Sequence, residues 1–350
     1  MVKTVQIVSL SSGIIGEEAV EHELKRGIKR LKDMGLNVRF SKHALWGLKY
    51  IKDHPEDRAE DLLEAFEDPE TDMILCAIGG DDTYRLLPYL FKKDRLEDAV
   101  TKKIFLGFSD TTMNHFMLHK VGLNTFYGQS FLADVCELAD DMLPYTEKYF
   151  RELVETGRIE SITPSDVWYE ERKSFGRDQA GTERVSHPDT GFELLQGNGR
   201  FFGKILGGCL DSMYDVFNNE RYPDTVKLCR KYELFPDAEE WRGRILLLET
   251  SEEKPSPESY EKMVTELKAH GVFDAVSGVL VGKPQDKIYE EEYKDILLRV
   301  IDDPELPVVW NINVGHASPR CIIPFGVDAD VDVQAQRITF NYEHSELQEA

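Results

Sequence analysis

Short apolar runs alternate with helix-like segments through the first half of the chain. Residues 5–10, 73–78 and 104–107 form continuous runs without a charged side chain, and segments with helical spacing of apolar residues lie between them. Continuous apolar strands joined by helices are typical of a parallel sheet that is covered on both faces. The alternation therefore predicts an α/β fold of the Rossmann or flavodoxin-like kind for the N-terminal half.

The second half has more strand character. Runs at 244–249, 278–281 and 308–312 have the composition of buried strands, and 329–333 and 337–340 alternate as half-solvated strands do. Residues 158–200 between the halves are polar and show no clear periodicity, which is typical of a functional loop or a linker. We therefore predict an N-terminal α/β domain over 1–165, a connecting and substrate-contacting loop over 166–200, and a β-rich α+β domain over 201–350.

Charge and cysteine usage narrow the class of protein. The chain of 350 residues has a formal net charge of −23, which argues against a nucleic acid or an anionic membrane as partner because both repel a negative field. No apolar run approaches the roughly 18 residues of a membrane-spanning helix, and the N-terminus lacks the apolar core of a signal peptide. The five cysteines are scattered, as expected for reduced thiols in a cytoplasmic protein.

Ser109 is the candidate nucleophile. Residues 104–112 are expected to form a strand, a sharp turn and the start of a helix, with Ser109 at the turn. Such a turn exposes the hydroxyl at the sheet edge, close to backbone N–H groups of the following helix. The pattern Gly107-x-Ser109-x-Thr111 differs from the G-x-S-x-G elbow in its last position. A serine that only caps the helix is the alternative.

Glu249 and His316 are the candidate partners of this serine. Glu249 ends an otherwise apolar strand, and His316 follows a glycine in the loop after another strand. A histidine can take the proton of a serine, and a buried carboxylate can hold the imidazole in the required tautomer. The alternatives are a solvated carboxylate at a strand end and a surface-loop histidine. The backbone N–H groups of Gly80 and Asp110 could bind the developing oxyanion.

Other motifs give weak support to a metal or a nucleotide cofactor. His115 and His119 are four residues apart, but Phe116 stands where a zinc protease needs glutamate. The segment from Gly13 to Gly16 is neither a Walker loop nor a G-x-G-x-x-G fingerprint. These motifs therefore give poor support to a zinc or nucleotide site, and a nucleotide-dependent Rossmann-type enzyme is a rival interpretation.

Five motifs in order along the chain resemble the LD-carboxypeptidase family of serine peptidases. They are Ile78-Gly79-Gly80, Phe105-Leu106-Gly107-Phe108-Ser109-Asp110-Thr111-Thr112, Gly203-x-x-x-Gly207-Gly208, Leu247-Leu248-Glu249 and Gly315-His316. The resemblance covers residues 5–340. It implies a serine peptidase with a Ser109–Glu249–His316 triad, an oxyanion hole from the backbone of Gly80 and Asp110, no metal or organic cofactor, and commonly a homodimer. A serine nucleophile with a histidine base is expected to act through an acyl-enzyme.

The family has two main branches with different substrates. One removes the terminal D-alanine of murein tetrapeptides in cell-wall recycling. The other resembles the microcin C immunity protein and cuts the amide-like bond between a peptidyl or aminoacyl group and a modified AMP. The run 249–257 and the extended loop 158–200 resemble the second branch, so a peptidyl- or aminoacyl-nucleotide hydrolase is expected. The murein peptidase is the alternative, and an inactive ligand-binding protein of the same fold is the alternative of another class.

Substrate contacts are expected around the loop and the glycine turn. Members of the second branch stack adenine on an aromatic ring, and Phe192 occupies the matching position where tryptophan is expected. Trp168 is a possible substitute within the loop. A substrate with a phosphate or carboxylate needs local positive charge, which Arg85 could supply. The candidate substrate contacts are Gly79, Asp82, Arg85, Trp168 and Phe192.

Overall fold

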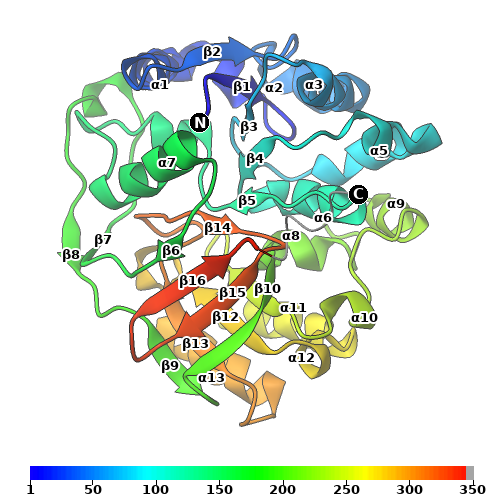
Figure 1. Cartoon of the computed structure of the whole chain (residues 1–350), viewed down its shortest axis with the longest axis vertical. Coiled ribbons are helices and arrows are strands. Elements are labelled where there is room, and N and C mark those ends of the chain that lie inside the picture. The colour runs from blue at the N-terminus through cyan, green and yellow to red at the C-terminus, as the bar shows by residue number, and fades with distance from the viewer. Residues whose placement is uncertain (344–350) are drawn as a thin grey trace.

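Two sheets, one built mainly from each half of the chain, lie along the longest axis of the molecule (Figure 1). The computed structural model describes residues 1–343. The N-terminal half, blue to cyan in Figure 1, lies above the C-terminal half, which runs from green to red. The candidate site lies where the two halves meet.

The first sheet has the strand order β14-β5-β4-β3-β1-β2. Its strands are β1 (Thr4–Val8), β2 (Asn37–Phe40), β3 (Met73–Cys76), β4 (Ile104–Gly107), β5 (Phe126–Tyr127) and β14 (Ile323–Pro324). The pairings among β1 to β5 are parallel. The accompanying helices are α1 (Glu21–Asp33), α2 (Gly47–Asp53), α3 (Pro55–Glu67), α4 (Leu87–Leu90), α5 (Arg95–Ala99), α6 (Thr112–Lys120) and α7 (Pro144–Thr156). The predicted N-terminal α/β fold is confirmed.

The second sheet has the strand order β6-β16-β15-β10-β11-β12-β13-β9. Its strands are β6 (Ser161–Ile162), β9 (Glu193–Gln196), β10 (Arg200–Cys209), β11 (Ile245–Glu249), β12 (Gly278–Gly282), β13 (Val308–Ile312), β15 (Asp328–Asp332) and β16 (Arg337–Asn341). Its helices are α8 (Leu210–Asp215), α9 (Thr225–Lys231), α10 (Ala238–Trp241), α11 (Pro257–Ala269), α12 (Val272–Ala275) and α13 (Glu290–Ile301). The predicted β-rich C-terminal part is confirmed. Strands β10 to β13 pair in parallel, and β11, β12 and β13 are buried along their whole length, as in a sheet covered on both faces.

The two sheets exchange short strands. Strand β14 comes from the C-terminal half, yet it pairs with β5 at the edge of the first sheet. Strand β6 pairs with β16, and β9 pairs with β13, so both sides of the polar stretch contribute to the second sheet. These exchanges tie the halves together. The domain boundaries near residues 165 and 200 stay predictions.

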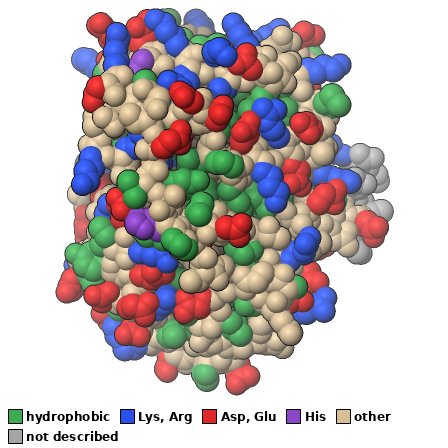
Figure 2. Space-filling view, turned by 90° about the vertical axis from the view of Figure 1, so that its left-hand side faces the viewer, with side chains coloured by type: hydrophobic (Ala, Val, Ile, Leu, Met, Phe, Trp, Pro, Cys, Tyr) green, Lys and Arg blue, Asp and Glu red, His purple; other side chains and the backbone are tan. Residues whose placement is uncertain are grey.

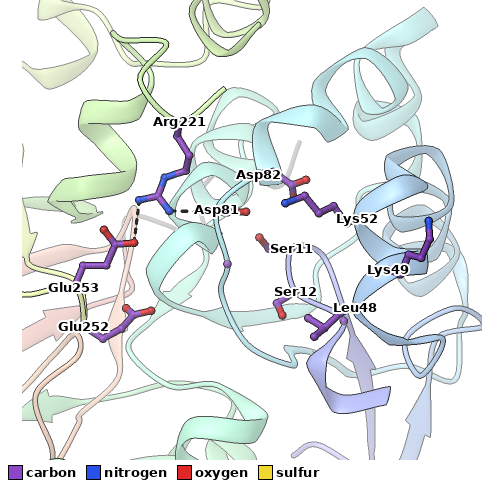
Figure 3. Close-up of a pocket in the computed structure, with 12 residues that line it drawn as sticks. Ser11, Ser12, Leu48, Lys49, Lys52, Asp81, Asp82, Arg221, Glu252 and Glu253 are labelled. Atoms are coloured by element: carbon purple, nitrogen blue, oxygen red, sulfur yellow. Dashed lines mark hydrogen bonds and ion pairs between the residues drawn. The ribbon is translucent and has the colours of Figure 1, made fainter. Parts of the chain in front are cut away.

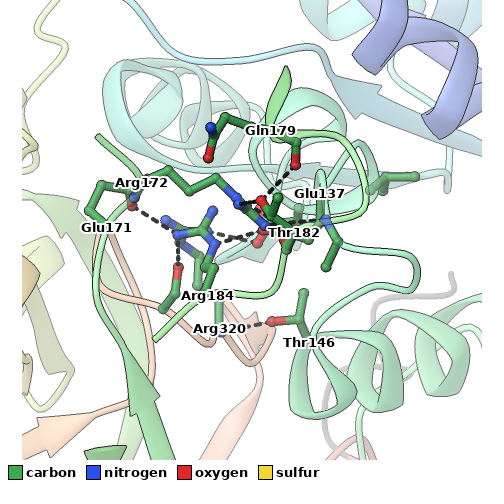
Figure 4. A network of polar contacts seen from close by, with 12 residues as sticks. Glu137, Thr146, Glu171, Arg172, Gln179, Thr182, Arg184 and Arg320 are labelled. Atoms are coloured by element: carbon green, nitrogen blue, oxygen red, sulfur yellow. Dashed lines mark hydrogen bonds and ion pairs between the residues drawn. The ribbon is translucent and has the colours of Figure 1, made fainter. Parts of the chain in front are cut away.

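The polar stretch 158–200 has a defined path across the molecule. It contains the hairpin of β7 (Val167–Tyr169) and β8 (Ser186–Pro188), at the left edge of Figure 1. Buried charges hold it in place: Arg172 lies 2.6 Å and Arg184 2.8 Å from the carboxylate of Glu137 (Figure 4). Both guanidiniums belong to the stretch, and Glu137 follows the first sheet. The charged residues that suggested an irregular loop therefore form the ion pairs that hold this segment in one conformation.

The surface carries acidic and basic side chains close together, as Figure 2 shows for one face. Among the described residues, no helix is long and apolar enough to cross a membrane. All five cysteines are buried and free.

Candidate active site

Ser109 lies on a sharp turn between β4 and α6. Its φ is +66°, in the left-handed region that residues other than glycine rarely adopt. Two hydroxyls close the turn: Thr111 donates to the backbone oxygen of Phe108 at 2.8 Å, and Thr112 donates to that of Ser109 at 2.7 Å. The elbow conformation is therefore present although Thr111 replaces its second glycine.

Gly79 lets the turn after β3 approach the serine. A β-carbon at this position would lie 2.6 Å from Cβ and 2.7 Å from Oγ of Ser109, which is closer than nonbonded atoms can come. The N–H of Ser12 donates to the Gly79 oxygen at 3.1 Å and fixes the turn from its other side. The predicted glycine is thus required by close packing against the nucleophile.

The structure brings Ser109, His316 and Glu249 together from three distant parts of the sequence. Nε2 of His316 lies 3.0 Å from the Ser109 hydroxyl, and Nδ1 of His316 lies 2.7 Å from Oε2 of Glu249. The same carboxylate oxygen accepts the backbone N–H of His316 at 3.2 Å. Glu249 ends β11 and is buried, so its carboxylate has a fixed direction. These contacts are the ones expected between a nucleophilic serine, a histidine base and a carboxylate that orients it.

Tyr127 connects the serine turn to the carboxylate. Its hydroxyl donates to Oε1 of Glu249 at 2.7 Å and accepts the backbone N–H of Ser109 at 3.1 Å. Tyr127 was not among the residues expected in the site. Its position at the end of β5, beside the strand that leads to Ser109, was the available signal.

A second carboxylate reaches the same imidazole. Oε2 of Glu252 lies 3.0 Å from Nε2 of His316, the nitrogen that faces Ser109. Burial disfavours the imidazolium, but Glu249 and Glu252 outweigh burial and raise the pKa of His316 to about 10. The hydrogen bond to His316 lowers the pKa of Glu252 to about 2. Sequence reasoning missed Glu252, although it lies three residues after Glu249.

The side chain of Asp110 points away from the candidate oxyanion site and into the protein. Its carboxylate accepts hydrogen bonds from the hydroxyls of Ser11 and Thr83, each at 2.6 Å, and from the Thr83 N–H at 2.9 Å. Burial raises the pKa of Asp110. The carboxylate thus ties two loops to the serine elbow. The backbone N–H groups of Gly80 and Asp110 stay the predicted oxyanion donors.

Two adjoining cavities lie beside the serine. The larger encloses about 580 Å³, and the smaller, about 30 Å³, includes Ser109 in its wall. Arg221 lies between them with its guanidinium 3.7 Å from Asp81 and 3.1 Å from Glu253 (Figure 3). The residues that line the larger cavity are Ser11, Ser12, Gly13, Leu48, Lys49, Lys52, Gly80, Asp81, Asp82, Arg221, Glu252 and Glu253. The cationic residues in this wall were missed, because α2 is short and Arg221 lies in an irregular turn.

The predicted aromatic contacts lie away from these cavities. Phe192 is only 5% exposed and packs in the hydrophobic core, so its ring offers no face to a base, and the expectation of a stacking ring there is wrong. Trp168 stacks on His187 with 4.5 Å between ring centroids, and the ammonium of Lys287 lies 5.7 Å from its centroid. Neither Trp168 nor Phe192 lines the two cavities beside Ser109.

The predicted polar contacts have structural partners. Asp82 lines the larger cavity, but one of its oxygens lies 2.6 Å from the buried guanidinium of Arg58. Arg85 lies over the ring of Tyr222, 4.6 Å from its centroid, and approaches the other Asp82 oxygen at 3.4 Å. Arg85 does not line either cavity. The cationic side chains that line the larger cavity are instead those of Lys49, Lys52 and Arg221.

The site offers one group of side chains with metal-like spacing. Ligand atoms of Cys209, Glu249 and His316 all lie within 4.8 Å of one another. Hydrogen bonds account for this arrangement, since both nitrogens of His316 and both carboxylate oxygens of Glu249 have partners. Burial raises the pKa of the Cys209 thiol well above its usual range, which disfavours the thiolate that binds metals.

A serine on an elbow, paired through an imidazole with a buried carboxylate, defines the class of serine hydrolases. Comparison with known protein families shows which family of serine hydrolases the chain matches. Residues 5–128 match the N-terminal domain of LD-carboxypeptidases, and residues 202–331 match their C-terminal domain. The chain belongs to the LD-carboxypeptidase family of serine peptidases.

Individual relatives lie in both branches of this family. An MccF-like protein from Streptococcus pneumoniae, whose structure is a complex with AMP, is 63% identical, with a TM-score of 0.97 and coverage of 98% of this chain and 99% of its own. The "Microcin C7 self-immunity protein MccF" of Escherichia coli is 24% identical over 83% of this chain and 79% of its own. Its complex with aspartyl sulfamoyl adenosine has the same fold, with a TM-score of 0.76 at 22% identity and coverage of 97% and 96%. The "Probable murein peptide carboxypeptidase" of Bacillus subtilis is 27% identical over 85% of this chain and 81% of its own.

Proposed function

We propose that Ser109, His316 and Glu249 are a catalytic triad that hydrolyses an amide-like bond. Ser109 Oγ attacks the acyl carbon while Nε2 of His316 takes its proton, and the N–H groups of Gly80 and Asp110 bind the oxyanion. The imidazolium then protonates the leaving nitrogen, and water hydrolyses the acyl-enzyme with His316 again as base. Glu249 holds Nδ1–H throughout. The two contacts of His316, at 3.0 Å and 2.7 Å, support this assignment.

The substrate that we propose is an aminoacyl- or peptidyl-nucleotide of the microcin C type. The observation that carries this proposal is the 63% identity to the MccF-like protein from Streptococcus pneumoniae, whose structure holds AMP. The larger cavity, about 580 Å³, falls within the usual range of small-molecule sites and adjoins the pocket of Ser109. The nucleotide part would occupy this cavity and the acyl carbon would lie at Ser109.

Hydrolysis of murein tetrapeptides is the second candidate. It is favoured by the relationship to the Bacillus subtilis protein, whose name assigns it murein peptides. That relationship, at 27% identity, is more distant than the one to the AMP-binding protein. Both candidates use the same nucleophile, so they differ only in what the large cavity holds.

A side-by-side assay separates these candidates. Aspartyl sulfamoyl adenosine and a murein tetrapeptide are each incubated with the protein and with Ser109→Ala, which removes a hydroxyl and little packing. We expect cleavage of the adenosine compound by the wild type only. Preferential release of D-alanine would assign the second candidate. Cleavage of neither, together with no fluorophosphonate adduct on Ser109, would contradict hydrolysis and favour a ligand-binding protein.

The family resemblance also implies a homodimer, and the scattered cysteines favour a cytoplasmic protein; we propose both. Light scattering on the full chain after size-exclusion chromatography measures the mass of the assembly. A mass of about one chain would contradict the dimer.

A further inference from the structure

Two carboxylates bind the two nitrogens of one imidazole. Glu249 lies 2.7 Å from Nδ1 of His316, and Glu252 lies 3.0 Å from Nε2. A carboxylate has only acceptor oxygens, so each nitrogen must carry a proton to make both contacts. An imidazole protonated on both nitrogens has no lone pair to receive the proton of Ser109. The arrangement in the free protein therefore blocks the base that the proposed mechanism needs.

Glu252 is placed to leave this position. It belongs to the loop that follows β11, and its side chain is 64% exposed. The loop itself is anchored on both sides: Ser251 donates its N–H to Asp211 at 3.0 Å, and the ammonium of Lys254 lies 2.6 Å from Asp286. Rotation of the Glu252 side chain would thus free Nε2 without moving the loop.

Glu252 also stands between the two cavities. Its side chain lines both the large cavity and the small pocket at Ser109, and it lies beside Glu253 in Figure 3. A substrate that spans the two cavities must pass this side chain. Binding of a substrate across the two cavities would therefore also move the Glu252 carboxylate away from His316.

We propose that Glu252 is a positioning residue that blocks His316 in the free protein and that bound substrate displaces. This inference rests on the proposed hydrolase function and deepens it. On displacement, Nε2 loses its proton to solvent, the neutral imidazole turns its lone pair to Ser109, and Nδ1–H stays on Glu249. Substrates that leave Glu252 in place would bind without being cleaved, so the residue also selects among ligands.

Other charged groups near the imidazole also influence the protonation of His316. The buried carboxyl of Asp211 interacts electrostatically with His316, and burial raises the pKa of this carboxyl. The guanidinium of Arg221 interacts electrostatically with Glu252. Arg320 donates to the His316 backbone oxygen at 3.0 Å, but its charge is matched by Asp134 at 2.9 Å. Among these groups, the carboxylates of Glu249 and Glu252 are the ones that contact the ring nitrogens.

The decisive measurement is the titration of His316 in the free protein by NMR, with ¹⁵N-labelled histidine and assignment from His316→Gln. Glu252→Gln removes the charge and keeps the size, and Glu253→Gln is the matched control because Glu253 pairs with Arg221 instead of His316. We expect Glu252→Gln to lower the midpoint by about one pH unit or more, as loss of a contacting opposite charge does. Glu253→Gln should leave it near the wild-type value. An unshifted midpoint in Glu252→Gln and Glu252→Ala, or an equal shift in Glu253→Gln, would overturn the proposal.

The displacement step has its own kinetic test, in the hydrolysis of aspartyl sulfamoyl adenosine. The acid limb of kcat/KM reports the free enzyme, and that of kcat reports the enzyme–substrate complex. In the wild type we expect the kcat limb at lower pH, because bound substrate has removed Glu252 from the imidazole. In Glu252→Gln the two limbs should come together. Coincident limbs in the wild type would overturn displacement by substrate.

The two experiments keep this inference separate from the proposed function. If no compound is hydrolysed, the hydrolase proposal fails, while the NMR titration still measures whether Glu252 holds the proton on His316. If hydrolysis occurs and Glu252→Gln leaves the titration midpoint of His316 unchanged, the triad assignment is supported and the blocking role of Glu252 is wrong.

Discussion

Tyr127 and Glu249 join the two sheets through one short hydrogen bond, in which the tyrosine hydroxyl donates to Oε1 of the carboxylate at 2.7 Å. Tyr127 ends β5 of the first sheet and Glu249 ends β11 of the second. Both residues are buried. The other carboxylate oxygen faces His316, so the tyrosine fixes the rotation of the group that orients the imidazole. The same hydroxyl accepts the N–H of Ser109, which couples both ends of the candidate triad to one side chain.

We predict that Tyr127→Phe lowers activity more than its loss of stability would suggest. A hydrogen bond to a charged group contributes about 1.5–3 kcal/mol, and loss of that amount in the transition state slows the reaction about 10- to 100-fold. The effect should fall on kcat, because the tyrosine lies behind Glu249 rather than in the cavity wall. Tyr145→Phe is the matched control, since its hydroxyl donates to the backbone oxygen of Thr163 at 2.6 Å. Equal kcat in wild type and Tyr127→Phe would contradict this role.

We predict that Gly79→Ala inactivates the protein with little loss of the fold. The added methyl group would lie 2.6 Å from the Ser109 β-carbon, so either the elbow or the glycine turn must shift. Misplacement of a reacting group by about 1 Å can cost on the order of a hundredfold in rate. The rate of fluorophosphonate labelling of Ser109 measures the effect, and calorimetry reports the fold. Gly199→Ala, where the nearest atom to the new methyl is 3.5 Å away, should label as the wild type does. Wild-type labelling of Gly79→Ala would show that the turn can adapt.

Much of the fold and the candidate triad could be predicted from the sequence because both depend on local patterns. The apolar runs before Ser109 and Glu249 were expected as strands and form β4 and β11. Glu249 ends one parallel strand of the second sheet and His316 follows another, and such strand ends meet at one edge, so these two could be expected to converge. Ser109 follows a strand of the first sheet, and its approach to them depends on the contact between the sheets. Their distances could not be predicted, because they depend on how the two sheets pack.

The remaining site residues depend on tertiary contacts that leave no local signature. Glu252 is one of several charged residues after β11, and only its rotamer brings it to His316. Phe192 was expected in the site because it matches the position of the stacking aromatic residue in the second branch of the family. The next residues form β9, which pairs with β13 and carries the ring into the core. Composition shows that a segment is polar, but not which of its apolar side chains the neighbouring sheet will cover.

We predict that Glu137→Gln loosens the polar stretch while the sheets stay folded. The side chains of Arg172 and Arg184 are 5% and 4% exposed and both pair with Glu137, at the centre of the network in Figure 4. The change leaves the buried guanidinium of Arg172 without its carboxylate partner, while Arg184 keeps Glu171 at 3.1 Å. Breaking a buried ion pair costs about 3–5 kcal/mol. Hydrogen exchange over residues 170–185 should accelerate more than exchange in the strands, and trypsin should cut within this segment.

The control for Glu137 is an exposed pair on the same stretch. Arg177 lies 3.4 Å from Glu21, and both side chains are largely in solvent. Exposed pairs contribute about 0–1 kcal/mol, so Glu21→Gln should leave exchange and proteolysis near the wild-type rates. If Glu137→Gln behaved like Glu21→Gln, the polar stretch would owe its path to other contacts.

Glu23 gives a prediction about stability and pH. Its side chain is buried beside Glu137, and one of its oxygens has no hydrogen-bond partner among the described residues. Burial, together with repulsion from Glu137, raises the pKa of Glu23 from 4.5 to about 7. Between these two values the folded protein holds a proton that the unfolded chain has released. The free energy of unfolding therefore falls as pH rises through this window, by about 2–3 kcal/mol for such a shift.

Glu23→Gln removes this titration, so its stability relative to the wild type should improve between pH 5 and pH 8. Urea unfolding at the two pH values measures the difference, and comparison of the variant with the wild type at each pH cancels the contributions of all other groups. Glu21→Gln again serves as the control: Lys25 lowers the pKa of Glu21, so that carboxylate is already ionised in both states above pH 5. The change in the free energy of unfolding caused by Glu21→Gln should therefore be the same at pH 5 and pH 8. An equally constant difference for Glu23→Gln would mean that the buried carboxyl stays ionised in the folded protein, and that the guanidiniums around Glu137 stabilise its charge as well.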